Sequence, residues 1–342
     1  MTQTNAETPG LIALDWGTSS LRAYLLGAAS GTVLDRRAGP WGVTRVPEGD
    51  FAAVLDAVIG AWRARSPGLP AIASGMIGSS RGWVDVPYCS CPAGLDELAA
   101  ALASVPDDAL RIVPGLVRPG DAPDVMRGEE TEILGALALR PELALRSVLV
   151  LPGTHSKWVT VAGGRIENFA TYMTGELFAV LRDHSILGGA ARDAAVDDAA
   201  VDDTGVDETR VEETAVRAAF ARGVTAARES AGGLAPILFS ARALVVTGRL
   251  AAGASLDYVS GMLIGDELRC GLAGMGVPAV GATPDAALRI ALVGDAALCR
   301  RYAAAFRLWG VGDVAVVDGA APAGLWRIAR RAALVARARG GA

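Results

Sequence analysis

The sequence is poor in the residues that build metal centres and disulfide frameworks. Its 342 residues include 4 cysteines and 2 histidines, and no two cysteines have the C-x₂-C spacing. A Cys/His zinc site needs such pairs, and a small secreted scaffold needs a much higher density of cysteine. The sequence therefore argues against both classes and predicts a thiol-reducing, cytoplasmic setting.

An excess of positive charge and long apolar runs are also missing. Lys and Arg together number 32 against 37 Asp and Glu, which gives a net charge of −5 and a pI near 5.2. No apolar run reaches the roughly 20 residues that a membrane-spanning helix needs. The first ten residues are polar and lack the apolar segment of a signal peptide. We therefore expect no nucleic-acid partner and no membrane partner.

The sequence does have enough length and apolar residues for two cored domains. Hydrophobic residues make up 51% of the 342 residues. Apolar runs of strand length alternate with stretches of helical periodicity, and glycine-rich turns separate them. This pattern predicts an α/β fold.

The stretch Leu11–Leu26 contains two strand-like apolar runs around the turn DWGTSS. Backbone N–H groups and hydroxyls at such a turn can bind phosphate oxygens. Asp15 at the base of the turn supplies a carboxylate for hydrated Mg²⁺. The residues expected to contact a nucleotide phosphate chain are Gly17, Thr18, Ser19 and Ser20.

The same arrangement recurs in the middle of the chain. VLVLPGTHSKWVTV again places Gly-Thr-x-Ser between strands, so Gly153 and Thr154 correspond to Gly17 and Thr18. The place of Asp15 is taken by Leu151, so the metal is assigned to the first hairpin alone. The repeat predicts two duplicated α/β domains, residues 1–143 and 144–342.

Acidic residues cluster in the segment RGEETE, where a helix begins. Acids in the first turn of a helix are favoured by the helix dipole, which is one explanation of Glu129 and Glu130. The other is a catalytic carboxylate. Gly294 follows an apolar strand and precedes a helix. Open α/β sheets bind ligands at the carboxyl ends of their strands, so Gly294 is a candidate for close backbone approach to a nucleotide.

Two segments look irregular or solvated. The stretch Gly115–Arg127 contains two prolines and a Pro-Gly and is expected to lack regular structure. The acidic, low-complexity stretch Ala190–Ala215 is expected to be a solvated connector or helix face.

These motifs together resemble a known family. DWGTSS resembles the first phosphate motif of the actin/hexokinase/Hsp70-type ATPase clan, and GVTR, ASGMIGSSRGW, VMRGEETEILGA, LPGTHSKWV, MTGEL and SGMLIGDEL together are similar to the 2-dehydro-3-deoxygalactonokinases. The resemblance implies two ribonuclease-H-like domains with a central cleft. It also implies ATP-dependent phosphorylation of the 6-hydroxyl of 2-dehydro-3-deoxy-D-galactonate in galactonate breakdown.

The resemblance also suggests roles for individual residues. Asp15 would bind Mg²⁺, and Glu129 or the adjacent Glu130 would accept the hydroxyl proton; kinases of the clan usually carry Asp there. The substrate carboxylate needs a cation, and Arg81 or Arg45 is favoured for it. The expected substrate contacts are Arg45, Met76, Arg81 and Arg127, and the expected ATP contacts of the second half are Gly153, Thr154, Lys157 and Gly294.

Several alternatives stay open. The epimeric 2-dehydro-3-deoxygluconate differs at a single hydroxyl that no motif reads. A phosphohydrolase or a nucleotide-gated binding protein of the same clan would share the hairpins. Walker-type, dinucleotide-type and protein-kinase motifs are missing from the sequence. The oligomeric state is undetermined, and a homo-oligomer is left open.

Overall fold

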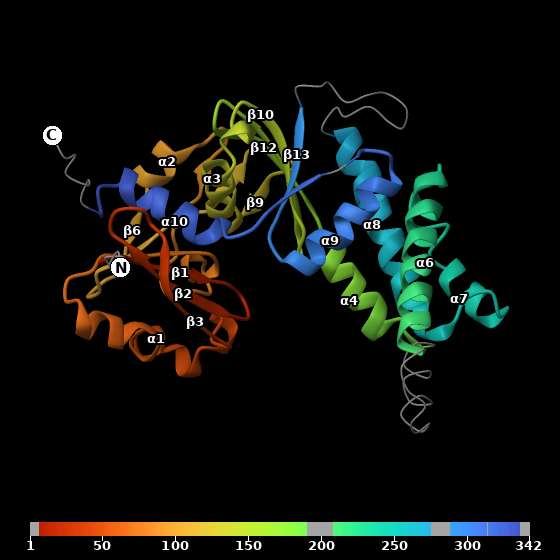
Figure 1. The fold of residues 1–342 in the computed structure, drawn as a ribbon, viewed down its shortest axis with the longest axis horizontal. Helices are drawn as coiled ribbons and strands as arrows, with labels where there is room; N and C mark the ends of the chain where they lie inside the picture. The colour runs from red at the N-terminus through yellow and green to blue at the C-terminus, as the bar shows by residue number, and fades with distance from the viewer. Residues whose placement is uncertain (1–6, 190–207, 275–287, 313, 336–342) are drawn as a thin grey trace, which may run out of the picture. The chain divides into compact units, whose positions relative to one another are not determined.

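The computed structural model describes residues 7–189, 208–274, 288–312 and 314–335 (Figure 1). The chain divides into two compact units. Unit 1 comprises Met1–Leu149, Val159–Phe169 and Val317–Ala342, and unit 2 comprises Val150–Trp158 and Ala170–Val316. Among the described residues, no helix has the length and apolarity needed to cross a membrane.

Unit 1 contains a mixed sheet whose strands follow the order β3-β2-β1-β4-β7-β6. Strands β1 and β2 are antiparallel, as are β2 and β3, whereas β4 runs parallel to both β1 and β7. The strands are β1 (Pro9–Trp16), β2 (Leu21–Gly27), β3 (Val33–Gly39), β4 (Ala71–Ser74), β6 (Ala103–Ser104) and β7 (Leu110–Ile112).

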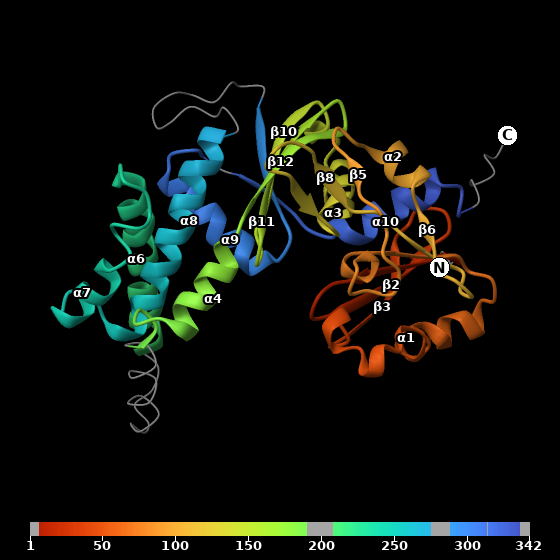
Figure 2. The ribbon, with the colours of Figure 1, turned by 180° about the vertical axis from the view of Figure 1, so that it is seen from behind.

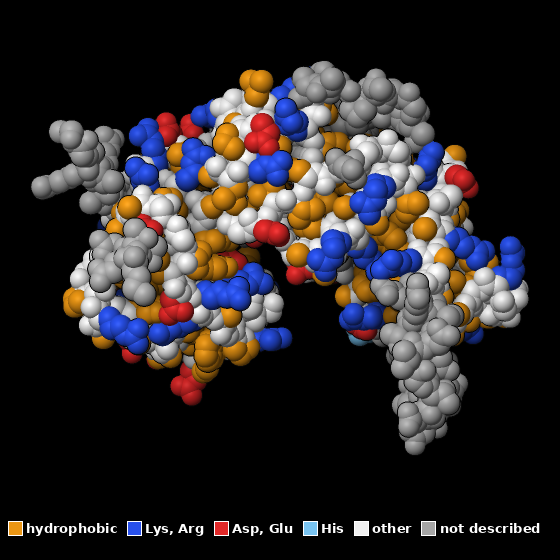
Figure 3. Space-filling model, viewed as in Figure 1, with side chains coloured by type: hydrophobic (Ala, Val, Ile, Leu, Met, Phe, Trp, Pro, Cys, Tyr) orange, Lys and Arg blue, Asp and Glu red, His pale blue; other side chains and the backbone are white. Residues whose placement is uncertain are grey.

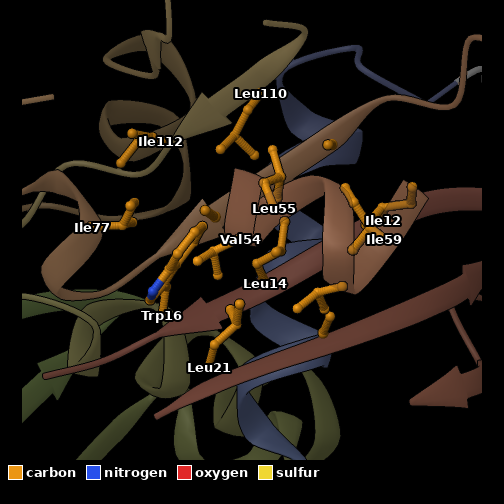
Figure 4. Close-up of a cluster of buried hydrophobic side chains, with 14 of the residues drawn as sticks. Ile12, Leu14, Trp16, Leu21, Val54, Leu55, Ile59, Ile77, Leu110 and Ile112 are labelled. Carbon is orange, nitrogen blue, oxygen red and sulfur yellow. The ribbon is translucent and has the colours of Figure 1, made fainter. Parts of the chain in front are cut away.

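Helix α1 (Phe51–Arg65) covers this sheet with its apolar face. It begins where the Asp50 side chain accepts a hydrogen bond from the amide of Ala53. Figure 4 shows Leu55 and Ile59 of α1 beside Ile12 and Leu14 of β1, in the core of this unit. This core extends to Trp16, the residue directly before the DWGTSS turn, and so fixes where the turn begins.

Helices α3 (Glu129–Leu139) and α10 (Ala320–Arg331) cross very closely in unit 1, and α2 (Leu95–Ala100) also packs on α10. A Cβ placed on Gly135 of α3 would lie 1.8 Å from the carbonyl oxygen of Ala320. A Cβ on Gly324 of α10 would lie 1.9 Å from the oxygen of Thr131. The backbones can approach this closely only because both positions lack a side chain.

The second sheet repeats the strand order of the first. Its strands are β10 (Arg146–Leu151), β11 (Ser156–Ala162), β12 (Arg165–Tyr172), β13 (Arg289–Val293) and β14 (Ala315–Val317), in the order β12-β11-β10-β13-β14. Numbered within its own set, each sheet contains the order 3-2-1-4-5, with β6 as an extra edge strand in the first. This is the ribonuclease-H-like order, and it confirms the predicted duplicated α/β fold.

The compact units are not two continuous halves. Unit 1 also contains residues of β11 and β12 and the helix α10, although these segments lie beyond Leu149 in the sequence. The predicted ranges 1–143 and 144–342 describe the duplicated segments rather than these units, and that division stays a prediction.

Unit 2 adds a helical layer to its strands. Helix α8 (Ser255–Gly274) lies alongside α6 (Glu208–Glu229) in both Figures 1 and 2, and glycines make the contact. A Cβ on Gly223 of α6 would meet the oxygen of Tyr258 at 2.1 Å. The described part of this unit also contains helices α4 (Thr174–His184), α7 (Ser240–Val246) and α9 (Ala296–Leu308).

The stretch Gly115–Arg127, expected to be irregular, contains two strands. β8 (Leu116–Arg118) and β9 (Asp124–Met126) pair antiparallel, and β5 (Cys89–Ser90) pairs with β8. Its Pro-Gly and second proline lie in the connection between the strands, where they remove no ladder hydrogen bond. The expectation was therefore wrong. Of the acidic stretch Ala190–Ala215, residues 190–207 lie outside the described residues.

Candidate functional site

The first hairpin presents its hydroxyls at an exposed tip. The amide of Gly17 donates to the carbonyl of Ser20 at 3.0 Å and closes the turn. Thr18 and Ser19 are exposed, and Ser20 is half-buried. At the base of the hairpin, the Asp15 carboxylate pairs with Arg22 Nη1 at 3.0 Å. The predicted phosphate-binding groups are thus presented together at one turn.

Three glycine-rich loops of unit 1 converge on this hairpin. A Cβ on Gly42 would lie 2.3 Å from the amide nitrogen of Ser19. Gly75, with φ of +96°, would place a Cβ 2.7 Å from the oxygen of Trp16, and Gly128, with φ of +111°, would place one 3.3 Å from the Cα of Gly75. The segments GVTR, ASGMIGSSRGW and VMRGEE therefore meet at the DWGTSS turn, although the sequence separates them widely.

The adjacent acids Glu129 and Glu130 have different surroundings. Glu129 is half-buried, and its Oε2 accepts the amide of Arg127 at 3.0 Å. Glu130 has 0% exposure and accepts from the amide of Gly128 at 2.7 Å and from the Thr131 hydroxyl at 3.0 Å. Burial, with a smaller contribution from the charge of Glu129, raises the pKa of Glu130 to about 8. Glu130 is therefore mostly protonated at neutral pH.

Two further charged residues, Arg22 and Glu132, belong to this cluster and were not predicted as site residues from the sequence. Burial raises the pKa of Asp15, Arg22 opposes this rise, and the charge of Glu129 adds to it. Burial also raises the pKa of Glu132 to about 8, and the charge of Asp15 contributes next. Arg22 could have been found from the register, because the turn puts it directly opposite Asp15. Glu132 lies one helical turn after Glu129.

Arg127 differs from the other predicted substrate contacts by being buried. It has 8% exposure, its Nη2 donates to the carbonyl of Val86 at 2.7 Å, and its guanidinium lies 4.3 Å from the centre of the Tyr88 ring. Its Nε and Nη1 are buried without a hydrogen-bond partner among the described residues. Arg45 and Arg81, by contrast, are exposed, and Met76 is half-buried.

The second hairpin lines a cavity within unit 2. The cavity has a volume of about 630 Å³, and Gly153 and Thr154 form one part of its wall. Phe178, Leu263 and Ile264 supply an apolar part. Concave sites of this volume and mixed character are typical of small-molecule and cofactor binding.

The predicted nucleotide contacts Gly294 and Lys157 lie near this hairpin. Gly294 has φ of +129°, and a Cβ there would be 3.8 Å from the oxygen of Pro152. The next residue, Asp295, lines the cavity and caps α9. Lys157 has 3% exposure, and its Nζ donates to the carbonyl of His155 at 3.0 Å. Lys157 is not among the residues that line the cavity.

A second groove, of about 650 Å³, lies between α6 and α9 and carries four arginines. Figure 3 shows arginine side chains, drawn in blue, over this region of unit 2. Arg301 lines both the groove and the cavity, and it pairs with Asp257 at 2.7 Å. This ion pair fixes part of the wall of the cavity.

The donor set at Asp15 fits a hydrated magnesium ion. No group of three or more His, Cys, Asp or Glu side chains suited to a metal occurs among the residues that the structure describes. Mg²⁺ keeps several waters and needs only one or two carboxylates beside substrate phosphates. Asp15, at the base of a turn with exposed hydroxyls, can supply such a carboxylate.

Comparison with known proteins assigns the family. Residues 15–328 match the family model described as 2-keto-3-deoxy-galactonokinase. The chain belongs to this family.

Relatives of the family agree with this assignment. The chain is 39% identical to a protein of Rhizobium meliloti (strain 1021) described as a probable 2-dehydro-3-deoxygalactonokinase, over 93% of this chain and 96% of the relative. It is 35% identical to the 2-dehydro-3-deoxygalactonokinase of Escherichia coli (strain K12), over 95% and 99%. A crystal structure of a candidate 2-dehydro-3-deoxygalactonokinase from Sinorhizobium meliloti superposes with a TM-score of 0.78 at 37% identity, covering 94% of this chain and 98% of that one.

The predicted family is thereby confirmed, and so is the prediction of a sugar-acid kinase.

Proposed function

We propose that this chain transfers the γ-phosphoryl group of ATP to the 6-hydroxyl of 2-dehydro-3-deoxy-D-galactonate, in the cytoplasm, as a step of galactonate breakdown. The observation that carries the proposal is in unit 1: three glycine-rich loops, one of which leads directly into Glu129, meet the phosphate hairpin that has Asp15 at its base. Phosphoryl transfer requires mainly positioning and charge stabilisation, and this arrangement can supply both.

The nucleotide contacts come from both hairpins. Thr18, Ser19 and Ser20 would donate to the β- and γ-phosphates, and Gly17, which closes the turn, would let the phosphates approach its backbone. Gly153 and Thr154 would hold the phosphates from unit 2, and Gly294 would allow the backbone to approach the nucleoside. Asp15 would hold Mg²⁺ through water, and the bound ion would neutralise phosphate charge during transfer.

Lys157 is the only lysine in the sequence, in which every other long basic side chain is arginine. The Lys157 side chain has 3% exposure and ends in a compact ammonium group. A guanidinium is planar and larger, so the two are not interchangeable there. The position at the hairpin supports a role for Lys157 toward the phosphates.

Glu129 is the better proton acceptor of the two candidate acids. Glu130 is fully buried, mostly protonated at neutral pH, and engaged in capping the start of α3. Glu129 is half-buried and lies among the loops that meet the first hairpin. Glu129 would therefore orient the 6-hydroxyl and accept its proton, and Glu130 would hold the helix start that presents Glu129.

Arg127 is the best-supported partner for the substrate carboxylate. A buried guanidinium with two unpartnered nitrogens is costly unless an anion compensates it. A Cβ on Gly78 would lie 2.9 Å from Arg127 Nη1, so the loop that carries Met76 and Arg81 covers this group. The carboxylate would enter as that loop moves, and Arg45 and Arg81, which are exposed, would contribute from the rim.

A coupled ATPase assay against a panel of 2-keto-3-deoxy sugar acids tests the proposal. We expect ADP release that depends on 2-dehydro-3-deoxy-D-galactonate, and a product phosphorylated at the 6-position. The epimeric gluconate derivative and the galactonate analogue with a reduced carboxylate serve as matched comparisons. Equal turnover of the epimer would contradict the proposed substrate, and ATP hydrolysis without any sugar acid would contradict a kinase.

A further inference from the structure

Two of the family-like segments, MTGEL and SGMLIGDEL, meet beneath the second hairpin. The second segment contributes Glu267 of α8, which has only 3% exposure. Its Oε2 accepts the hydroxyl of Tyr302 at 2.6 Å, and its Oε1 accepts the indole N–H of Trp158 at 2.8 Å. The hydroxyls of Thr174 and Ser156 also hydrogen-bond to this carboxylate. One buried carboxylate thus links α4, α8, α9 and β11.

The direction of these hydrogen bonds can be worked out from the chemistry of the groups. An indole N–H can only donate, so Trp158 requires an acceptor from Glu267. Burial and the neighbouring Glu267 raise the pKa of Tyr302 well above its usual value, so the Tyr302 hydroxyl keeps its proton. Ser156 Oγ lies 3.0 Å from the Tyr302 hydroxyl and points its proton into this network. Its lone pairs remain available to the Gly153 amide, which lies 3.4 Å away.

The start of α4 supports the hairpin from another direction. The amide of Glu176 donates to the carbonyl of Thr154 at 3.0 Å. A Cβ on Gly175 would lie 2.5 Å from the oxygen of Gly153, so the two backbones are in direct contact. The hairpin at the cavity wall is therefore held by side chains and backbone that lie behind it.

We propose that Glu267 is a positioning residue, which acts through Tyr302 and Ser156 to hold the Gly153–Thr154 turn in the shape that binds the phosphates of ATP. This inference rests on the proposed function, because it assigns that turn to the nucleotide. Glu267 and Ser156 do not line the cavity, whereas Gly153, Thr154 and Tyr302 do. Their effect on the nucleotide therefore passes through residues that do line it, and the bond from Ser156 to the Gly153 amide leads to the turn.

A purely structural role accounts less well for this carboxylate. Burying a charged group costs free energy that an apolar side chain of similar volume avoids. Here the cost is offset by donors from three elements, α4, α9 and β11, all directed at the Glu267 carboxylate beneath the turn. Such a network fixes a single geometry, which is what a phosphate-binding turn requires.

Ser156→Ala is the most selective test, because it removes the link to Gly153 and leaves the other partners of Glu267 in place. We expect equilibrium binding of Mg²⁺-ATP, measured by calorimetry, to weaken roughly tenfold, the effect of losing about one hydrogen bond to a charged network. The KM for ATP should rise in parallel while the KM for the sugar acid stays unchanged.

Tyr258→Phe provides a matched control in the same unit. Tyr258 has 3% exposure, and its hydroxyl bonds to Ser240 at 2.9 Å. Its loss should lower thermal stability about as much as Ser156→Ala without changing ATP binding. Wild-type ATP affinity in Ser156→Ala, or an equal loss in both variants, would overturn the inference.

Glu267→Gln provides a second measurement. Its amide replaces one of the two acceptor oxygens with an NH₂ donor, which faces Tyr302 or Trp158, so ATP binding should weaken at least as much as in Ser156→Ala. The double variant should bind ATP no more weakly than Glu267→Gln alone, because both changes break the same connection from Glu267 through Tyr302 and Ser156 to the turn. Additive losses of affinity would overturn the inference. If Glu267→Gln does not fold, Ser156→Ala decides. If the wild-type chain binds no ATP, the proposed function is rejected as well. If the wild-type chain binds ATP and the variants bind it equally well, only the positioning role of Glu267 is rejected.

Discussion

Glu129 and Glu130 show how adjacent residues of one type acquire different chemistry. Successive residues in a helix point about 100° apart, so α3 directs Glu130 into the interior and leaves Glu129 half-buried. The sequence identified the pair but not the difference, because the face of the helix that is buried depends on α10, nearly two hundred residues later in the chain. Burial then raises the pKa of Glu130.

Replacing Glu129 with Gln should abolish most turnover. We expect kcat to fall about 100-fold or more, the usual contribution of a positioned general base, with ATP affinity nearly unchanged. Glu142→Gln is a suitable control, because Glu142 pairs with Arg140 on the surface. Single-turnover phosphorylation and ATP calorimetry measure the two quantities. Near-normal turnover in the Glu129 variant would remove this residue from the reaction.

Glu130 should make the folded chain less stable as the pH rises. Its pKa is raised from 4.5 to about 8 in the fold, so between these values the native state binds more protons than the unfolded state. The stabilisation is present below about pH 4.5 and is lost as the pH approaches 8. Urea unfolding from pH 5 to 8 should therefore show a shallower pH dependence in Glu130→Gln. The wild-type slope in that variant would contradict the assignment.

Arg127→Met should raise the KM for the sugar acid by roughly 100-fold, the effect of losing a charged, partly bidentate contact, and leave the ATP affinity unchanged. Arg37→Met is a matched control, because Arg37 also lies over an aromatic ring, at 4.5 Å from Trp62, and donates to one backbone carbonyl. Steady-state kinetics with both substrates measure the effect. Equal changes in the two variants would show that only stability was affected.

At the scale of elements, the sequence predicted long periodic segments well and short ones poorly. The regular apolar stripe over Phe51–Arg65 is visible in the sequence, and α1 has these bounds because a cap and a Pro-Gly stop coincide with its two ends. β8 and β9 have three residues each, too few for any periodicity to be seen. Likewise, the Glu267 network joins four elements, so no local pattern could have predicted it.

The crossing of α3 and α10 should tolerate no side chain. Gly135→Ala would place a Cβ against backbone atoms of Ala320, and we expect a loss of about 2 kcal/mol in the free energy of unfolding. Gly60→Ala in α1 is the control, because its Cβ would meet only the end of the Asp56 side chain. That change should be neutral or stabilise by up to about 1 kcal/mol. Chemical denaturation that shows equal effects would contradict the close crossing.

At the scale of the whole molecule, the repeated strand order accounts for the two similar hairpins, each of which connects the first two strands of its sheet. The repeat was visible in the sequence because the hairpins keep their turn residues. The exchange of segments between units was not visible, because residues 159–169 and 317–331 carry no motif that indicates which unit they join.

Hydrogen exchange should distinguish the two ligands by the segments that each one protects. Mg²⁺-ATP should protect amides around Gly153 and Gly294, and the sugar acid should protect those from Gly75 to Arg81 and around Gly128, because bound ligands suppress local opening. Arg127→Met should lose only the second pattern. Protection of the Gly75–Arg81 loop by ATP alone, with no effect of the sugar acid, would contradict the assigned substrate site.

The return of α10 to unit 1 has a consequence for biosynthesis. A ribosome releases the strands of unit 1 first, yet the helix that covers α3 and β1 emerges only after residue 316. The nascent first unit must therefore wait, with apolar surface uncovered, while unit 2 is translated, about 10 to 30 seconds at roughly 5 to 20 residues per second. Until α10 has been translated, the unfinished chain therefore keeps apolar surface exposed, the kind of surface that chaperones bind.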